Sequence, residues 1–132
     1  MLAPEYLTGL AEAIGSFTYS RSPGNITVYF ALRLPARDRE VLEAVREFLA
    51  VGRLYSVPGG LYLRVSRHDE LLRVVDHFDL HPLRGHRHEA FRIWREMVEI
   101  KSRFRQPDLH RLSNLAAQLS SLKASRGRGA TP

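Results

Sequence analysis

Apolar side chains recur at every second position from Ile26 to Leu34, which is the period of a strand with one buried face. Pro35 ends the pattern, because proline cannot donate a ladder hydrogen bond. A shorter run precedes it across the turn residues Ser-Pro-Gly-Asn, and two more runs flank Pro-Gly-Gly in the manner of a hairpin. The pattern therefore predicts four strands, over residues 16–22, 26–34, 54–57 and 61–66.

Between and after these strands, apolar residues recur at three- and four-residue spacing, which is typical of amphipathic helices. The segment Val41, Leu42, Val45, Phe48 and Leu49 is one such face. The spacing, together with proline near two helix starts and glycine after the first helix, predicts helices over residues 4–14, 37–50, 67–77, 86–104 and 108–123.

The elements follow the order helix, strand, strand, helix, strand, strand, helix, and then further helices. This order predicts an α+β domain whose helices pack on one face of an antiparallel sheet, leaving the other face to water or to a partner. At 132 residues we expect a single domain, over residues 1–123. Residues 124–132 are rich in Arg, Gly and Ser, and we expect them to form a flexible basic tail.

The net charge of the chain indicates what kind of partner it binds. The chain has 20 lysine and arginine residues against 14 aspartate and glutamate residues, a formal net charge of +6. A basic surface attracts polyanions and releases their counterions, so nucleic acid is the first partner to consider. The chain has no cysteine, which excludes disulfides and thiolate sites, and no apolar run reaches membrane-spanning length. We expect a cytoplasmic protein, nucleoid-associated if bacterial.

The segment from Leu7 to Phe17 reads L-T-G-L-A-E-A-I-G-S-F. It joins a short apolar helix, with Gly9 and Ala13 on one side, to a Gly-Ser-Phe that opens a strand. This segment resembles the signature of the LAGLIDADG homing endonucleases, L-A-G-L-I-D-A-D/E-G-S-F. One position departs from that signature. Ile14 stands where the family has the acidic residue that holds the catalytic metal.

The resemblance continues in order beyond the signature. It implies a homing-endonuclease-like αββαββα fold with a saddle-shaped antiparallel sheet and extra C-terminal helices. After Pro82-Leu83 the family usually has Thr-x-Lys, and this chain has Gly85 and Arg87 in those places. The further fragments that resemble the family lie at Phe30–Leu34 with Asp38, Phe48–Tyr55, Tyr62–Ser66, His77–Leu83 and Phe91.

The signature occurs once, and family members with one motif pair two chains. The resemblance therefore implies a homodimer whose first helices meet at the two-fold axis. The residues agree, because Gly9 and Ala13 lie four apart on one helical face and let two backbones approach closely. The alternative is that both pack against the chain's own sheet. The predicted dimer interface consists of Thr8, Gly9, Glu12 and Ala13.

The resemblance also implies that the sheet enters the major groove of double-stranded DNA. Alternation places polar and aromatic side chains, without any acid, on the outer face of the strands. Arginines there can fork onto guanine or phosphate, and hydroxyls can bind bases or backbone; the alternative is an ordinary solvated face. The predicted DNA-binding residues are Ser16, Thr18, Ser20, Thr27, Tyr29, Arg33, Arg53, Tyr55, Tyr62, Arg64 and Ser66, and Arg126 and Arg128 of the tail can add phosphate contacts.

The family cleaves DNA with Mg²⁺, for which carboxylate oxygens are the natural ligands. Isoleucine at position 14 cannot coordinate a metal. Glu12 lies about 200° away around the helix and suits a capping or surface role. The histidines His81, His86 and His88 lack zinc-ligand spacing. We therefore expect no catalytic residue, no metal site, no cofactor, and a nuclease activity that has been lost.

Three functions remain open from the sequence. The first is a DNA-binding homodimer without nuclease activity, which acts as a transcription regulator or binds intron RNA as a splicing helper. The second is an active, metal-dependent, site-specific DNA endonuclease that draws its metal ligand from an unexpected residue. The third is a protein-interaction or remnant domain that binds no nucleic acid.

Overall fold

The computed structural model of the chain describes residues 2–103 and 108–130, and its strands form one antiparallel sheet in the order β1-β2-β4-β3. Each strand begins and ends within one residue of the range that alternation predicts. The hairpin β1–β2 pairs Ser16 with Ala31 and runs to the turn at residues 22–25, and β2 pairs with β4 from Phe30 to Leu34. The strands are β1 (Ser16–Ser22), β2 (Asn25–Leu34), β3 (Arg53–Val57) and β4 (Gly60–Val65).

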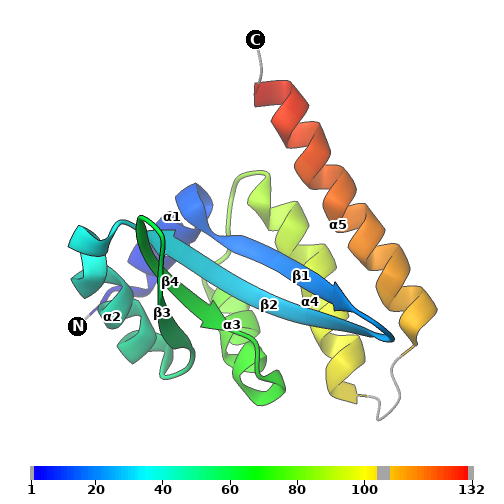
Figure 1. Ribbon diagram of the computed structural model, residues 1–132, viewed down its shortest axis with the longest axis horizontal. Coiled ribbons are helices and arrows are strands. Elements are labelled where there is room, and N and C mark those ends of the chain that lie inside the picture. The colour runs from blue at the N-terminus through cyan, green and yellow to red at the C-terminus, as the bar shows by residue number, and fades with distance from the viewer. Residues whose placement is uncertain (1, 104–107, 131–132) are drawn as a thin grey trace.

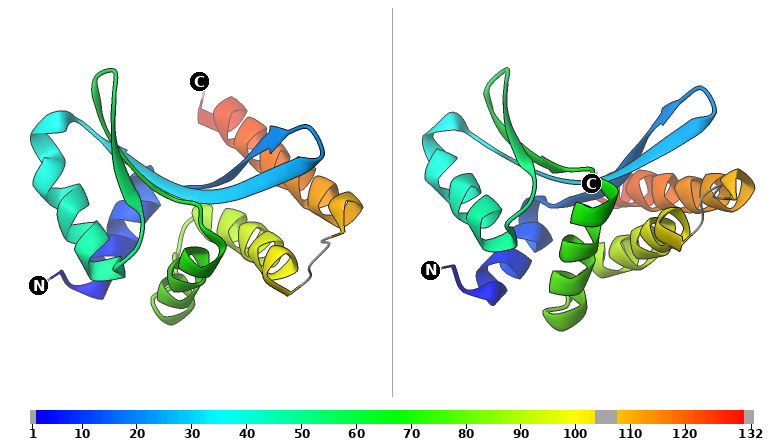
Figure 2. Two further views of the ribbon diagram at one scale, coloured as in Figure 1. Left: turned by 60° about the horizontal axis from the view of Figure 1, so that its bottom comes forward. Right: turned by 90° about the horizontal axis from the view of Figure 1, so that it is seen from below.

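The helices lie below the sheet, while the two hairpins rise at its ends and give it a saddle shape (Figure 2). This arrangement confirms the predicted α+β fold with helices on one face of the sheet. One predicted helix is divided, because residues 36–38 form a 3-10 turn, η1 (Ala36–Asp38), before α2 begins. The helices are α1 (Pro4–Ile14), α2 (Arg39–Leu49), α3 (His68–Leu80), α4 (Arg87–Arg103) and α5 (Leu109–Ala130).

Five aromatic side chains form the centre of the core between the sheet and the helices. The ring of Phe17 on β1 lies 5.1 Å from Phe30, 5.2 Å from Phe78, and 5.3 Å from both Phe91 and Trp94, measured between centroids. Most of these contacts are tilted or edge-to-face, the arrangements that aromatic quadrupoles favour. The cluster joins β1 and β2 to α3 and α4, so it sets the position of the helices under the saddle.

The last helix begins beside the tip of the β1–β2 hairpin and diverges from β1 toward its C-terminal end (Figure 1). Its apolar face is buried through Leu112, Leu115, Ala116 and Leu119. The backbone stays helical to Ala130, past the predicted end at residue 123. Residues 131–132 and the side chains of 124–130, on which the expectation of a flexible basic tail rests, lie outside the described part. Every helix within the described ranges is too short or too polar to span a bilayer.

Candidate nucleic-acid interface

The helices leave the outer face of the sheet open, and a row of side chains crosses it at the level where α1 ends. Ser16 pairs with Ala31, Ala31 with Arg64, and Arg64 with Arg53. A second row runs beside it, in which Arg33 pairs with Tyr62 and Tyr62 pairs with Tyr55. None of the four strands contains an aspartate or a glutamate. The outer face is therefore basic and aromatic.

Most of the predicted DNA-binding residues lie on this face with accessible side chains. Six are exposed, namely Ser16, Ser20, Arg33, Arg53, Tyr55 and Ser66. Four are half-buried, namely Thr27, Tyr29, Tyr62 and Arg64. The side chains of Arg126 and Arg128 lie outside the described part of the chain.

Thr18 departs from the expectation that it is open to a ligand, since only 7% of it is exposed. Its hydroxyl accepts a hydrogen bond from the ammonium group of Lys123 on α5. Its backbone carbonyl accepts one from Trp94 Nε1, which also donates to the carbonyl of Tyr29. Thr18 is thus covered by α5, a helix that the sequence pattern predicts without indicating that it lies beside β1.

Three side chains of the outer face hold one another in place. The guanidinium carbon of Arg64 lies 3.9 Å from the centre of the Tyr29 ring, a cation–π contact. Burial, followed by the neighbouring Tyr29, raises the pKa of the Tyr62 phenol, and Arg64 opposes that rise. Arg33 is fixed separately, because its Nη2 donates to the carbonyl of Pro58 at 2.8 Å. These contacts orient both arginines before any ligand arrives.

The end of α1 lies beside this face and carries a hydrocarbon side chain. Ile14 is partly buried and packs against the core. Gly15 follows it, and a Cβ there would lie 2.7 Å from the carbonyl oxygen of Ala11, so only glycine fits. Arg87 binds the end of the helix, with Nε donating to the Gly15 carbonyl at 2.9 Å and Nη1 to the Glu12 carbonyl. A cation at a helix C-terminus meets the negative end of its dipole.

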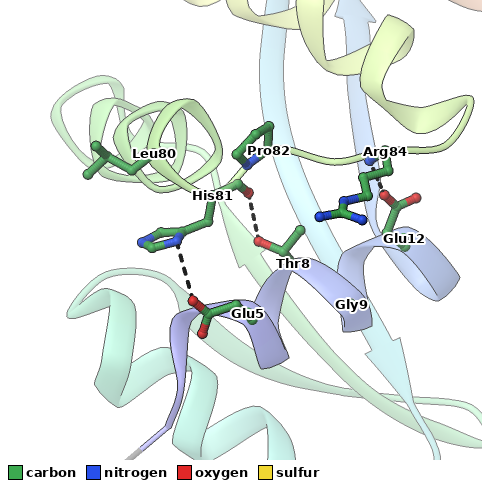
Figure 3. Close-up of a pocket in the computed structure, with 8 residues that line it drawn as sticks. All are labelled: Glu5, Thr8, Gly9, Glu12, Leu80, His81, Pro82 and Arg84. Carbon is green, nitrogen blue, oxygen red and sulfur yellow. Dashed lines mark hydrogen bonds and ion pairs between the residues drawn. The ribbon is translucent and has the colours of Figure 1, made fainter.

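Glu12 binds a loop of its own subunit instead of capping a helix. Its carboxylate accepts hydrogen bonds from the backbone amides of Arg84 and Gly85, in the loop between α3 and α4. These amides, together with the positive charges of Arg87 and His86, lower the pKa of the Glu12 carboxyl against an opposing effect of burial. Figure 3 shows Glu12 turned toward this loop, so its oxygens are engaged within the subunit.

Thr8 ties α1 to α3 through two hydrogen bonds. Its hydroxyl donates to the His81 carbonyl at 2.8 Å, so the same oxygen accepts from His77 Nε2 at 3.2 Å. Burial, followed by the neighbouring His81, lowers the pKa of His77 to about 4, which leaves the ring neutral at pH 7. His81 in turn lies 3.9 Å from a carboxylate oxygen of Glu5 (Figure 3).

The predicted dimer residues fall into two groups. Thr8 and Glu12 point into the subunit, as described above. Gly9 and Ala13 are exposed, and among the described residues nothing would lie within 4 Å of a Cβ added at Gly9. The alternative in which these two small residues pack against the chain's own sheet is therefore wrong. Gly9 also borders a pocket of about 410 Å³ between α1 and the loop that carries Pro82.

The residues around the end of α1 do not fit a divalent cation. Ile14 offers only hydrocarbon, the Glu12 carboxylate is bound to two backbone amides, and Arg87 adds a positive charge. Within residues 2–103 and 108–130, no three histidine, aspartate or glutamate side chains gather in a way that could hold a metal. The histidines around the 81–88 loop form no such group.

Comparison with known proteins places the chain in one family. Residues 7–98 match the family model of the LAGLIDADG endonucleases. The probable intron-encoded DNA endonuclease 1 of Mycosarcoma maydis is 30% identical over 101 residues, which make up 70% of this chain and 37% of that protein. This chain therefore spans little more than a third of that relative.

Solved structures of homing endonucleases share the fold. The homing endonuclease I-TnaI superposes with a TM-score of 0.82 at 22% identity, over 96% of this chain and 97% of that one. The meganuclease I-AabMI, bound to uncleaved DNA, gives 0.78 at 26% identity, over 94% of this chain and 44% of that one. The archaeal intron-encoded I-Vdi141I, in complex with DNA, gives 0.76 at 24% identity, over 90% and 82%. The signature at the end of α1, the saddle-shaped sheet and these matches together identify the chain as a member of the LAGLIDADG endonuclease family.

Proposed function

We propose that this chain is a homodimer that binds double-stranded DNA through the outer face of its sheet and has lost nuclease activity. One juxtaposition carries the proposal. An acid-free face with orientated arginines lies beside a helix end at which Ile14 replaces the metal-binding acid of the family signature.

The DNA-binding part is supported by charge and by geometry. A two-stranded ribbon fits the major groove, and guanidinium groups can bind guanine edges or phosphates there. Arg33 and Arg64 are already held in place by the Pro58 carbonyl and the Tyr29 ring, so less side-chain entropy is lost on binding. The relatives I-AabMI and I-Vdi141I were solved with DNA.

The dimer is supported by the exposed strip of α1. Gly9 and Ala13 present almost no side chain, and Tyr6, 49% exposed, stands beside them. Two such strips related by a two-fold axis would let the helix backbones meet closely. Pairing would place two saddles side by side and would double the number of arginines along one duplex.

Loss of cleavage follows from the chemistry of the α1 end. Phosphodiester hydrolysis of this kind needs a metal to activate water and to stabilise the leaving oxygen. Magnesium prefers carboxylate ligands. Ile14 supplies none, and Glu12 is held by the amides of Arg84 and Gly85.

Fluorescence anisotropy with a library of labelled duplexes tests the binding. The double variant Arg33→Ala/Arg64→Ala is expected to bind at least tenfold more weakly than wild type, an order of magnitude set by two lost phosphate or base contacts. The matched control Arg46→Ala/Arg73→Ala removes the same charge from exposed positions on α2 and α3, and should bind as wild type does. Equal losses of affinity in the two double variants would indicate that DNA is attracted by the net charge of the protein and not by this face of the sheet. A preference for structured RNA over the duplexes would instead favour the intron-RNA helper.

Cleavage is tested on the same library with magnesium and with manganese. Wild type is expected to leave the duplexes intact. Metal-dependent double-strand cuts by the wild-type protein would refute the loss of activity and select the endonuclease alternative. Cuts by Ile14→Asp, but not by Ile14→Asn, would show that the carboxylate alone had been missing.

The dimer is tested by light scattering coupled to size exclusion. Wild type is expected to elute with the mass of two chains, and Gly9→Leu with the mass of one folded chain. Ala117→Leu, at an exposed position on α5, is the control and should stay dimeric. A wild-type monomer at micromolar concentration would contradict the proposal.

A further inference from the structure

A pocket of about 220 Å³ lies where the ends of β3 and β4 meet the start of α3. Arg53 comes from the first residue of β3, Arg64 from β4, and Arg67 from the residue that precedes α3. Three guanidinium groups from three elements thus border one small volume. The pocket is lined by Arg53, Tyr55, Arg64, Ser66, Arg67 and Glu70.

Two of these arginines bring like charges to neighbouring strands. Arg53 and Arg64 are direct cross-strand partners on antiparallel strands, and like charges in that position repel. The ion pairs in the described part of the chain include neither of them. The guanidinium of Arg64 instead stacks on Tyr29. An anion between the two would turn the repulsion into attraction.

Glu70 is the acidic residue of the pocket, and its carboxylate is bound to neighbouring residues of the pocket wall. Its Oε1 accepts the backbone amide of Gly52 at 2.9 Å, and its Oε2 lies 3.7 Å from Arg67 Nε. Its side chain is 21% exposed, whereas that of Arg67 is 67% exposed. Three positive groups and one negative group leave a formal charge of +2 on the pocket lining, and Asp69, outside the lining, lies 3.5 Å from Arg67 Nε.

We propose that this pocket is a phosphate-binding site which, on the proposed function, holds a backbone phosphodiester of the bound duplex. A guanine edge takes one bidentate arginine, whereas a tetrahedral phosphate offers oxygens to several guanidinium groups at once. The hydroxyls of Ser66 and Tyr55 are further donors in the lining. Such a contact fixes the register of the sheet on the duplex and adds affinity that does not depend on base sequence.

The salt dependence of duplex affinity tests the site. The Arg53→Gln/Arg67→Gln double variant is expected to reduce the slope of log K against log salt by about 0.9, the value of one phosphate, and each single variant by a part of this; a change of 0.9 corresponds to about an eightfold loss at one-tenth molar salt relative to one molar. The loss should be the same for every duplex sequence. Arg73→Gln, an exposed arginine of α3 that borders a different pocket, should keep the wild-type slope.

A second arm uses inorganic phosphate alone. Phosphate is expected to raise the melting temperature of wild type above that in chloride of equal ionic strength, and the Arg53→Gln/Arg67→Gln double variant should lose this increase. If wild type shows no salt-dependent duplex affinity but keeps the phosphate effect, the proposed function fails and the pocket stands as a site for free phosphate. The opposite outcome has three parts: wild type binds duplexes, both single variants keep its salt slope, and phosphate leaves the melting temperature unchanged. In that case the phosphate site is refuted and the proposed function survives.

Discussion

Acidification is expected to weaken this fold through His77. The ring is 7% exposed, and it is packed against Phe48, Phe78 and His81. Burial disfavours the charged imidazolium and lowers the pKa of His77 from 6.5 to about 4. Between pH 6.5 and the folded pKa, the unfolded chain therefore binds a proton at His77 that the folded chain does not bind. The stability that depends on a neutral His77 is fully present above pH 6.5 and is lost as the pH falls toward the folded pKa.

The two pKa values set the size of the effect. At pH 5 the unfolded histidine is almost fully protonated, while the folded one is protonated in only about one molecule in ten, which corresponds to a loss of about 2 kcal/mol relative to pH 7.5. Lowered below its usual 4.5, the pKa of Glu12 leaves that side chain ionised at pH 5. Most of the loss between these two pH values is thus assigned to His77, with His81 and Glu5 as its titratable neighbours.

Urea denaturation at the two pH values measures this loss. His77→Gln removes the titrating ring but keeps an amide that can donate to Thr8, so its stability should change by less than about 1 kcal/mol over the same interval. His68→Gln, at an exposed position on α3, is the control and should follow wild type. Equal pH dependence in wild type and His77→Gln would refute the assignment.

Three further predictions concern the packing of the core and of α1. Trp94→Phe removes the donor shared by the carbonyls of Thr18 and Tyr29 and part of the ring volume, so it should lower the free energy of unfolding by about 2–3 kcal/mol in urea titrations. Gly15→Ala forces a Cβ against the Ala11 carbonyl and should cost about 1–3 kcal/mol. Gly9→Ala adds a methyl where there is room and should raise the stability of a single chain by up to about 1 kcal/mol; thermal melts at low protein concentration compare the two glycine variants.

The sheet could be predicted from the sequence because its signals are local. The alternation from Ile26 to Leu34 and the turn residues on either side determine where β2 starts and which side chains face outward. The same alternation predicts Arg33, Arg53 and Arg64 on one face, where the structure has them. The resemblance carried by the signature at Leu7–Phe17 adds the saddle shape of the sheet, which alternation alone does not contain.

The contacts that the sequence does not predict all join residues far apart in the chain. Thr18 is covered because Lys123, 105 positions later, reaches it from α5. In the sequence, Arg87 is only a departure from the family pattern. In the structure it binds carbonyls at the end of α1, including that of Gly15, which lies 72 positions earlier in the chain. The arginine pocket likewise depends on the packing of α3 against the sheet, which brings Arg67 beside Arg53. Local spacing carries no signal for such contacts.

Ile14 and Arg87 both favour the stability of the end of α1. A carboxylate at a helix C-terminus is repelled by the dipole, whereas Ile14 packs against the core and Arg87 binds the terminal carbonyls. Ile14→Asp should therefore lower the free energy of unfolding in metal-free buffer by more than Ile14→Asn does. Both variants lose the packing, so their difference isolates the charge and is expected to be about 0.3–1 kcal/mol at low salt. It should shrink as salt is added, because salt screens the dipole. A difference of opposite sign would mean that Arg87 turns from the carbonyls to the new carboxylate, and that this helix end can still accommodate an acid.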